Sequence, residues 1–150
     1  MSVSKAYTGK GTVLGIATIA APTVFTTVAE LKTFSFSGTK NDTEDVTNSD
    51  STGRAHEFIV TLLDSGEISI AGNYVGGDVG QIAFRAAFNA GSVVPFKMTL
   101  PVGPGQTTSG DVFAFIGAVV ENALSVEYNK ANSFSAKVKI SGVISYTAGT

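Results

Sequence analysis

Carboxylates are concentrated in one polar stretch of the chain, residues 38–57, which reads GTKNDTEDVTNSDSTGRAHE. Clustered Asp, Asn and Ser oxygens are the hard ligands that Ca²⁺ prefers in proteins. The stretch lacks the D-x-[DN]-x-[DN]-G spacing, because Asp45 is followed by Thr47 and Ser49, and no bidentate glutamate stands at the required distance. We therefore expect no metal site, and we interpret the stretch as a solvated loop or a protein contact.

Other residues of the chain could in principle carry catalysis or bind a nucleotide. His56 is the single histidine. A Ser–His–Asp site stays open, because its members need not be adjacent in sequence, but no G-x-S-x-G elbow is present. Glu121 and Glu127 would lie about 20 Å apart on a continuous strand, too far for glycoside hydrolysis. The glycines of residues 72–80 match neither phosphate-binding pattern, and Asp78 would repel a phosphate. We predict no enzyme, no catalytic residue and no cofactor.

The acidic stretch lies between two segments that have strand character. Residues 31–37 alternate apolar and polar side chains, and residues 58–63 form an apolar run that ends at Asp64-Ser65-Gly66. Loops of more than about 12–15 residues are usually functional or disordered in compact domains. A small domain cannot bury so many carboxylates and backbone groups without partners. We therefore predict a hairpin-like arm with a long, structureless acidic loop over residues 38–57 that projects from the body.

The remaining pattern predicts a single, mainly β domain over residues 1–150. The predicted strands are 12–19, 31–37, 57–64, 67–72, 94–100, 112–120, 123–128 and 134–146. The last is the clearest, because Phe134, Ala136, Val138 and Ile140 alternate with Ser and Lys, and Gly142 after them marks a bulge or bend. One apolar and one polar face are typical of a sandwich or an open barrel.

One helix is predicted over residues 78–90. Asp78 is a good N-cap, Gln81 completes a capping-box pattern, and Gly91 provides the left-handed stop. One face carries apolar residues at helical spacing: Val79, Ile82, Ala83, Ala86 and Ala90. Phe84 and Phe88 lie on an adjacent face. Because Arg85 is the only ionised residue after the cap, we expect the helix to be covered on more than one side.

The composition favours self-association. Only 15% of the 150 residues are charged, against about 25% in an average protein. A lightly charged surface indicates that much of it faces other subunits. The net charge of −2 argues against general nucleic-acid binding, and the absence of cysteine excludes disulfides.

The two ends of the chain are predicted to be flexible, as an arm over residues 1–10 and a tail over residues 147–150. The apolar run 13–21 follows Lys5 and Lys10, as in a signal peptide, but a first strand fits it equally well. No apolar run approaches the roughly 18–20 residues of a membrane span.

The run TTVAELKTFSFSGTKNDTEDVTNSDSTG, followed by FIVTLLDSGEISIAGNYVGGDVGQ, resembles the major tail tube proteins of long, non-contractile-tailed bacteriophages. The likeness covers about residues 8–146 and lies in the order of elements: a V-A-E-L entry, an acidic D-V-T-N loop, an L-L-D-S-G turn and a helix. It implies a virion protein, assembled in the host cytoplasm, whose hexameric rings stack into a hollow tube. The inner strands would pair around each ring into a continuous barrel. The implied partners are further copies of the chain and the tape-measure, tail terminator and distal tail proteins.

The resemblance also assigns roles to residues. The stretch 38–57 would contact the adjacent ring, and its carboxylates would meet Lys or Arg there. The expected contact residues are Asp42, Glu44, Asp45, Asn48 and Asp50. DNA would pass through the tube without specific binding, so an acidic or neutral lumen is favoured. The candidates for the lumen, each on or beside a predicted strand, are Glu67, Glu121 and Glu127.

Two other interpretations remain open. The chain could be another ring-forming tail component, such as a terminator or distal tail protein, which would make single rings. It could also be a secreted β-domain that binds a carbohydrate or another ligand, with residues 1–21 as its signal. The inner tube of contractile tails shares the architecture, so the non-contractile assignment depends on the local motifs alone.

Overall fold

The structure, a computed structural model, describes residues 4–18 and 20–150. Within these residues the chain forms nine strands and one helix, α1 (Val79–Ala90). The strands are β1 (Val13–Ile16), β2 (Thr26–Thr27), β3 (Leu31–Phe36), β4 (Lys40–Asp45), β5 (Phe58–Asp64), β6 (Glu67–Asn73), β7 (Val93–Thr99), β8 (Val112–Ser125) and β9 (Ser133–Thr147). Seven of them form one antiparallel sheet in the order β2-β1-β7-β8-β9-β6-β3, and β4 pairs with β5 alone.

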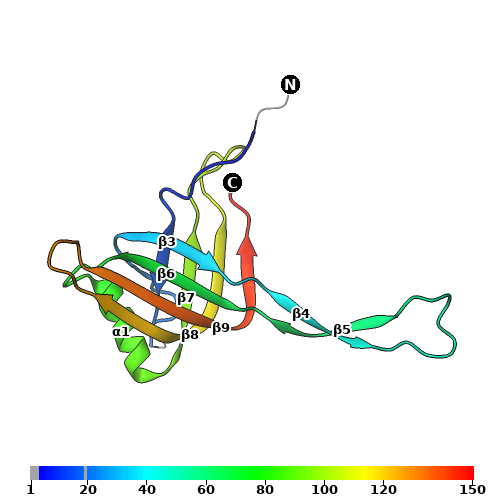
Figure 1. The fold of residues 1–150 in the computed structure, drawn as a ribbon. Helices are drawn as coiled ribbons and strands as arrows, with labels where there is room; N and C mark the ends of the chain where they lie inside the picture. Colours follow the sequence, from blue (N-terminus) through cyan, green and yellow to red (C-terminus); the bar gives the residue numbers. More distant parts are fainter. Residues whose placement is uncertain (1–3, 19) are drawn as a thin grey trace.

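The large sheet curls into a half-barrel around the core (Figure 1). The prediction for the last strand is confirmed, because Phe134, Ala136, Val138 and Ile140 of β9 are all buried. Residue Gly142 has a φ of 79°, and the pairing of β8 with β9 shifts its register beside it, so the predicted bend is also present. The fold is mainly β with one helix, as the sequence predicts.

Helix α1 covers one end of the core and begins and ends where the sequence predicts. Asp78 accepts a hydrogen bond from the Gln81 amide (3.0 Å), and Gly91 has the left-handed φ of 64°. The capping box is only half formed, because the Gln81 side chain is buried and bonds to other segments. Its amide nitrogen donates to the carbonyl of Asn73 (2.9 Å), and its oxygen accepts from the amide of Val75 (3.0 Å).

The side of the helix that lies on the core is not the apolar face that its sequence pattern marks. The buried positions are Gly80, Gln81, Phe84 and Ala87, whereas Val79 and Ile82 are exposed. Phe84 packs on Phe96 of β7 and on Phe134 of β9, with ring centroids 5.5 and 6.1 Å apart. Gly80 allows this orientation, because a Cβ there would overlap the backbone of Thr27 and Val28. Backbone approach at a glycine, and not the number of apolar residues, sets which side faces the core.

Several strand predictions require correction. The two strands predicted at 112–120 and 123–128 are one continuous strand, β8, whose register shifts between Val119 and Glu121. The strand predicted at 12–19 is shortened to β1, and its last residue, 19, lies outside the described residues. The sequence did not predict β2 or β4. The turn at residues 64–66 joins β5 to β6, but these strands do not pair with each other.

Residues 4–10 and the C-terminal tail lie on the same side of the molecule as the loop 101–110 (Figure 1). Of the predicted arm 1–10, residues 1–3 lie outside the described residues, and residues 4–10 are exposed without strand structure. The predicted tail 147–150 contacts the loop 101–110. The carbonyl oxygen of Thr150 accepts hydrogen bonds at 2.7–3.1 Å from three amides of this loop, those of Thr107, Thr108 and Ser109. In the described part of the chain, no helix has the length and apolar character to cross a membrane.

Candidate assembly surfaces

The acidic stretch forms half of a two-stranded arm that leaves the body of the protein (Figure 1). The prediction of a projecting hairpin is confirmed, but residues 40–45 are strand β4 and not structureless loop. The sequence KNDTED has low β-propensity, and it pairs because the neighbouring strand β5 is rich in apolar and β-branched residues. A register shift lies between Asn41 and Thr43, where the Thr61 hydroxyl donates to the Asp42 carbonyl (3.2 Å).

The two strands of the arm differ sharply in polarity. All six residues of β4 are polar, whereas β5 reads FIVTLLD, and every residue of both strands is exposed. Leu62 is 73% exposed, Phe58 65% and Val60 58%, and Ile59 and Leu63 on the same strand are also exposed. An isolated two-stranded hairpin is marginally stable in water, and contiguous exposed apolar groups mark interaction surfaces. The arm therefore has the composition of a segment that another molecule covers.

The tip of the arm is held by its own polar side chains. The Thr47 hydroxyl accepts from the Glu57 amide (2.8 Å), and the Ser51 hydroxyl donates to the Glu57 carboxylate (2.7 Å). The Asn48 side chain accepts from the amide of Asp50 (2.8 Å). Local side-chain bonds of this kind are typical of Asn, Ser and Thr in turns. They explain why a stretch so rich in these residues folds back on itself without apolar contacts.

His56 has a structural partner in this tip. Its Nδ1 lies 3.2 Å from the Asp45 carboxylate, in a highly exposed position. The pKa of Asp45 is lowered from its ordinary value of 3.8, chiefly because the side chain and then the amide of Thr47 donate to its carboxylate, with a smaller contribution from His56. Within the described residues, no cluster of three His, Cys, Asp or Glu could hold a metal ion.

The base of the arm is fixed to the sheet. Gly66 has a φ of 79°, and a Cβ there would overlap the carbonyl oxygen of Gly38, which lies in the segment between β3 and β4. The buried Ser65 hydroxyl donates to the carbonyl of Gly142. The Gly66 amide donates to the Asp64 carboxylate (2.9 Å), and this bond, more than the charge of Lys139, lowers the pKa of Asp64. These contacts set the direction in which the arm leaves the body.

The predicted contact residues are spread along the arm. Asp42, Glu44 and Asp45 lie on β4, whereas Asn48 and Asp50 lie in the tip, and all five are exposed. Sequence reasoning did not single out the apolar residues of β5, although they are the more unusual surface. The signal was present, because residues 58–63 are apolar on both faces, with Thr61 the one exception, and such a run predicts a strand that is covered on both faces.

A second surface lies on the side of the sheet opposite the core. Glu121 of β8 pairs with Lys137 of β9 (3.6 Å), and Glu67 of β6 stands opposite Lys139 in register. Thr33, Ser35, Ser69 and Ser135 surround the first pair. The structure therefore brings Glu67 and Glu121 onto one hydroxyl-rich face. It does not bring Glu127 there, because that residue lies in the turn after β8 and pairs with Lys130 (3.4 Å).

Comparisons with known proteins give one family, from a family profile, and one fold, from solved structures. The family profile for phage tail tube proteins matches residues 6–146. No curated protein sequence matches the chain. Among solved structures, the tail of an empty GTA particle with C6 symmetry aligns with a TM-score of 0.72 at 23% identity, over 95% of this chain and 100% of that chain. The SPP1 tail tube aligns with a TM-score of 0.69 at 13% identity, over 95% of this chain and 80% of that chain.

The sheath–tube complex of an extracellular contractile injection system, PVC, also has this fold, with a TM-score of 0.64 at 10% identity, over 91% of this chain and 88% of that chain. The likeness to solved tubes thus extends over contractile systems, and it supports the architecture and no finer assignment. The family profile covers nearly the whole described fold, including the arm and the hydroxyl-rich face. The chain belongs to the phage tail tube protein family and is a structural component of the virion tail.

Proposed function

We propose that six copies of the chain close into a ring, and that the rings stack into a hollow tube because the β4–β5 arm of each copy binds a subunit of the next ring. The observation that carries this proposal is the arm itself, whose apolar strand β5 is covered by none of the described residues. The sixfold ring is supported by the C6 symmetry of the GTA tail, which has the same fold. A head-to-tail contact that closes produces such a ring.

The edges of the large sheet support ring closure. In the part of the chain that the structure describes, strand β3 pairs with β6 alone and β2 with β1 alone, so each has a free edge. A free edge is a liability in a monomer, but in a ring it can pair with the neighbouring subunit. Such pairing would continue the sheet from subunit to subunit around the tube.

The hydroxyl-rich face is our candidate for the lumen, with Glu67 and Glu121 on it. Its lysines have carboxylate neighbours, because Lys137 pairs with Glu121 and Lys139 with Asp64 (3.5 Å). Paired charges leave little attraction for the phosphate backbone, so DNA could pass without being held. Glu127, in the turn, is a weaker candidate. Changing Lys137 and Lys139 to Gln should make a tube lumen more negative in a solved map, and an unchanged lumen would remove this assignment.

The tape-measure protein inside the tube, and terminator and distal tail proteins at its ends, are the partners that we propose from family membership. The non-contractile assignment likewise stays a proposal. The alternative of a terminator or distal ring predicts single rings of the purified protein. Long tubes would exclude that alternative.

Removal of the arm tests the stacking role. Lys40 and Asp64 are paired at its base, so replacing residues 41–63 by Asn-Gly closes the hairpin with a two-residue turn. The contacts of Ser65 and Gly66 remain in this variant. We expect electron microscopy to show tubes for the wild type and at most single rings for the variant. Normal tubes from the armless chain would contradict the role of the arm.

A further inference from the structure

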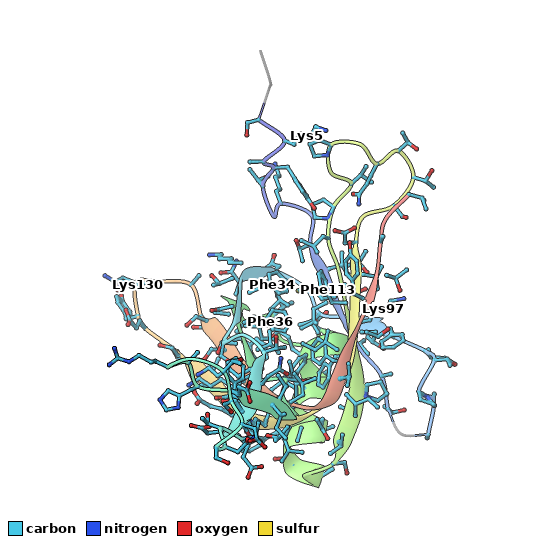
Figure 2. The ribbon with its side chains drawn as sticks, turned by 90° about the vertical axis from the view of Figure 1, so that its right-hand side faces the viewer. Lys5, Phe34, Phe36, Lys97, Phe113 and Lys130 are labelled. Atoms are coloured by element: carbon cyan, nitrogen blue, oxygen red, sulfur yellow. The ribbon has the colours of Figure 1, made fainter. Side chains whose placement is uncertain are left out.

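A third surface, separate from the arm and from the hydroxyl-rich face, lies between strand β3 at one edge of the curled sheet and the segment that leads into β1. It is a groove with a volume of about 660 Å³, bounded by residues 9–12, by strand β3 and by the end of β7. Its apolar lining consists of Leu31, Phe34 and Phe36 of β3 with Met98 and Leu100. Figure 2, viewed from the side of the arm, shows Phe34 and Phe36 near the middle of the view, and Phe36 also packs on Phe115, with ring centroids 6.2 Å apart.

The rim of the groove is basic. Lys10 and Lys32 both line it, and both are exposed. Among the described residues, neither lysine lies within ion-pair distance of a carboxylate, whereas Lys130, Lys137 and Lys139 each have such a partner. The groove therefore combines an apolar floor with two cations that are not neutralised within the chain.

The arm has the complementary pattern. Strand β5 presents apolar side chains, and Asp42 and Glu44 of β4 are exposed carboxylates that make no ion pair within the described chain. The arm cannot occupy the groove of its own chain, because it leaves the body after Phe36 and points away from it (Figure 1). A second copy is therefore the occupant that fits both the apolar and the charged parts of the groove.

We propose that the groove between β3 and residues 9–12 receives the β4–β5 arm of a second copy. This inference rests on the proposed stacking function and names the acceptor surface. Strand β5 covers the exposed parts of Phe34, Phe36 and Leu100, and the carboxylates of β4 face Lys10 and Lys32. The apolar contact supplies most of the affinity, while the charges fix the register and exclude wrong alignments.

Cross-linking tests the contact directly, because the chain contains no cysteine. The variant Glu44→Cys, Lys32→Cys is assembled and treated with a short bis-maleimide, which tolerates a small error in register. The matched controls combine Glu44→Cys with Lys97→Cys or Lys130→Cys. Lys97 lies over the Phe25 ring (5.0 Å to the centroid) on the other side of β7, and Lys130 lies in the turn after β8 (Figure 2).

We expect covalent dimers and longer ladders from the Lys32 variant at a yield at least about tenfold above either control, because docking raises the effective concentration of the two thiols. Tubes that give an equal or greater yield with Lys97→Cys or Lys130→Cys would overturn the groove and leave the stacking function intact. A wild-type chain that forms neither rings nor tubes would overturn the stacking function and the groove together.

Exchange of charges between the groove and the arm provides a second test. If these residues only supported the fold of the protomer, restoring opposite charges across the contact would not restore assembly. The variant Lys10→Glu, Lys32→Glu should lose stacking, and so should Asp42→Lys, Glu44→Lys. Combining all four changes should restore tubes, because opposite charges again face each other across the contact. Combining the arm changes with Lys130→Glu, Lys137→Glu should not restore them. Tubes formed by this control would contradict the proposal. So would a fourfold variant that circular dichroism shows to be folded but that forms no tubes.

Discussion

Leu62 offers the sharpest separation between folding and assembly. It lies on β5 and is 73% exposed in the protomer, so its side chain contributes little to the stability of the isolated chain. In the proposed tube, the same side chain is covered by a subunit of the next ring. We therefore predict that Leu62→Ser leaves the protomer folded and weakens the stacking of rings.

The magnitude follows from the exposed fraction. Full burial of a leucine side chain stabilises by about 1.5–3 kcal/mol, so covering the exposed three-quarters of Leu62 contributes about 1–2 kcal/mol per contact. Each 1.4 kcal/mol changes an association constant tenfold. The critical concentration for tube formation should therefore rise by a factor of about 5–30.

Sedimentation of tubes at increasing protein concentration measures this shift. Leu62→Met is the matched control, because it keeps an apolar side chain of similar volume and should assemble near the wild-type concentration. The thermal midpoint of the unassembled protomer should be unchanged in both variants. Equal critical concentrations for wild type and Leu62→Ser would refute the reasoning that β5 is covered in the tube. A large fall in the thermal midpoint would show that Leu62 supports the fold itself.

Three further changes test the fold that positions the arm. Gly66→Ala should destabilise the protomer by at least about 2 kcal/mol in urea unfolding, because a side chain at this positive φ also meets the Gly38 carbonyl. The control Gly38→Ala also has a positive φ but meets no neighbouring atom, so it should cost less. Gln81→Leu should cost about 2–4 kcal/mol, because it leaves partly buried backbone groups of Asn73 and Val75 without their side-chain partner. The exposed Arg85→Ala should stay within about 0.5 kcal/mol of wild type. Thr47→Val should raise the pKa of Asp45 in an NMR titration, because the hydroxyl bond that chiefly lowers it is lost. Because the pKa of Asp45 is lowered on folding, its carboxylate stabilises the tip at pH values above the ordinary pKa of 3.8, and this contribution disappears as the pH falls through the lowered pKa. The wild-type tip should therefore open at a more acidic pH than the tip of the variant. Identical pKa values in the two proteins would contradict the assigned cause.

Local patterns predicted those parts of the fold that local forces decide. The alternation from Phe134 to Ile140 predicts the buried face of β9, and Asp78 and Gly91 predict both ends of the helix. The side of the helix that faces the core was not predicted, because a close backbone contact at Gly80 decides it. Such a contact depends on residues far away in the sequence.

The arm shows the same limit. Its position was predicted from the polar stretch, but β4 was not, because KNDTED pairs only through its neighbour β5. The sequence drew attention to carboxylates, whereas the structure adds the uncovered apolar strand and the groove with Lys10 and Lys32. Residues 10, 32 and 98 are remote in sequence, and only the curling of the sheet brings them to one surface.

A cryo-electron microscopy map of tubes formed by the wild-type chain tests the central claim most directly. We predict stacked sixfold rings in which each β4–β5 arm crosses to the next ring, with Leu62 buried against a neighbouring subunit. Arms that end in solvent or line the lumen, with Leu62 uncovered, would contradict it.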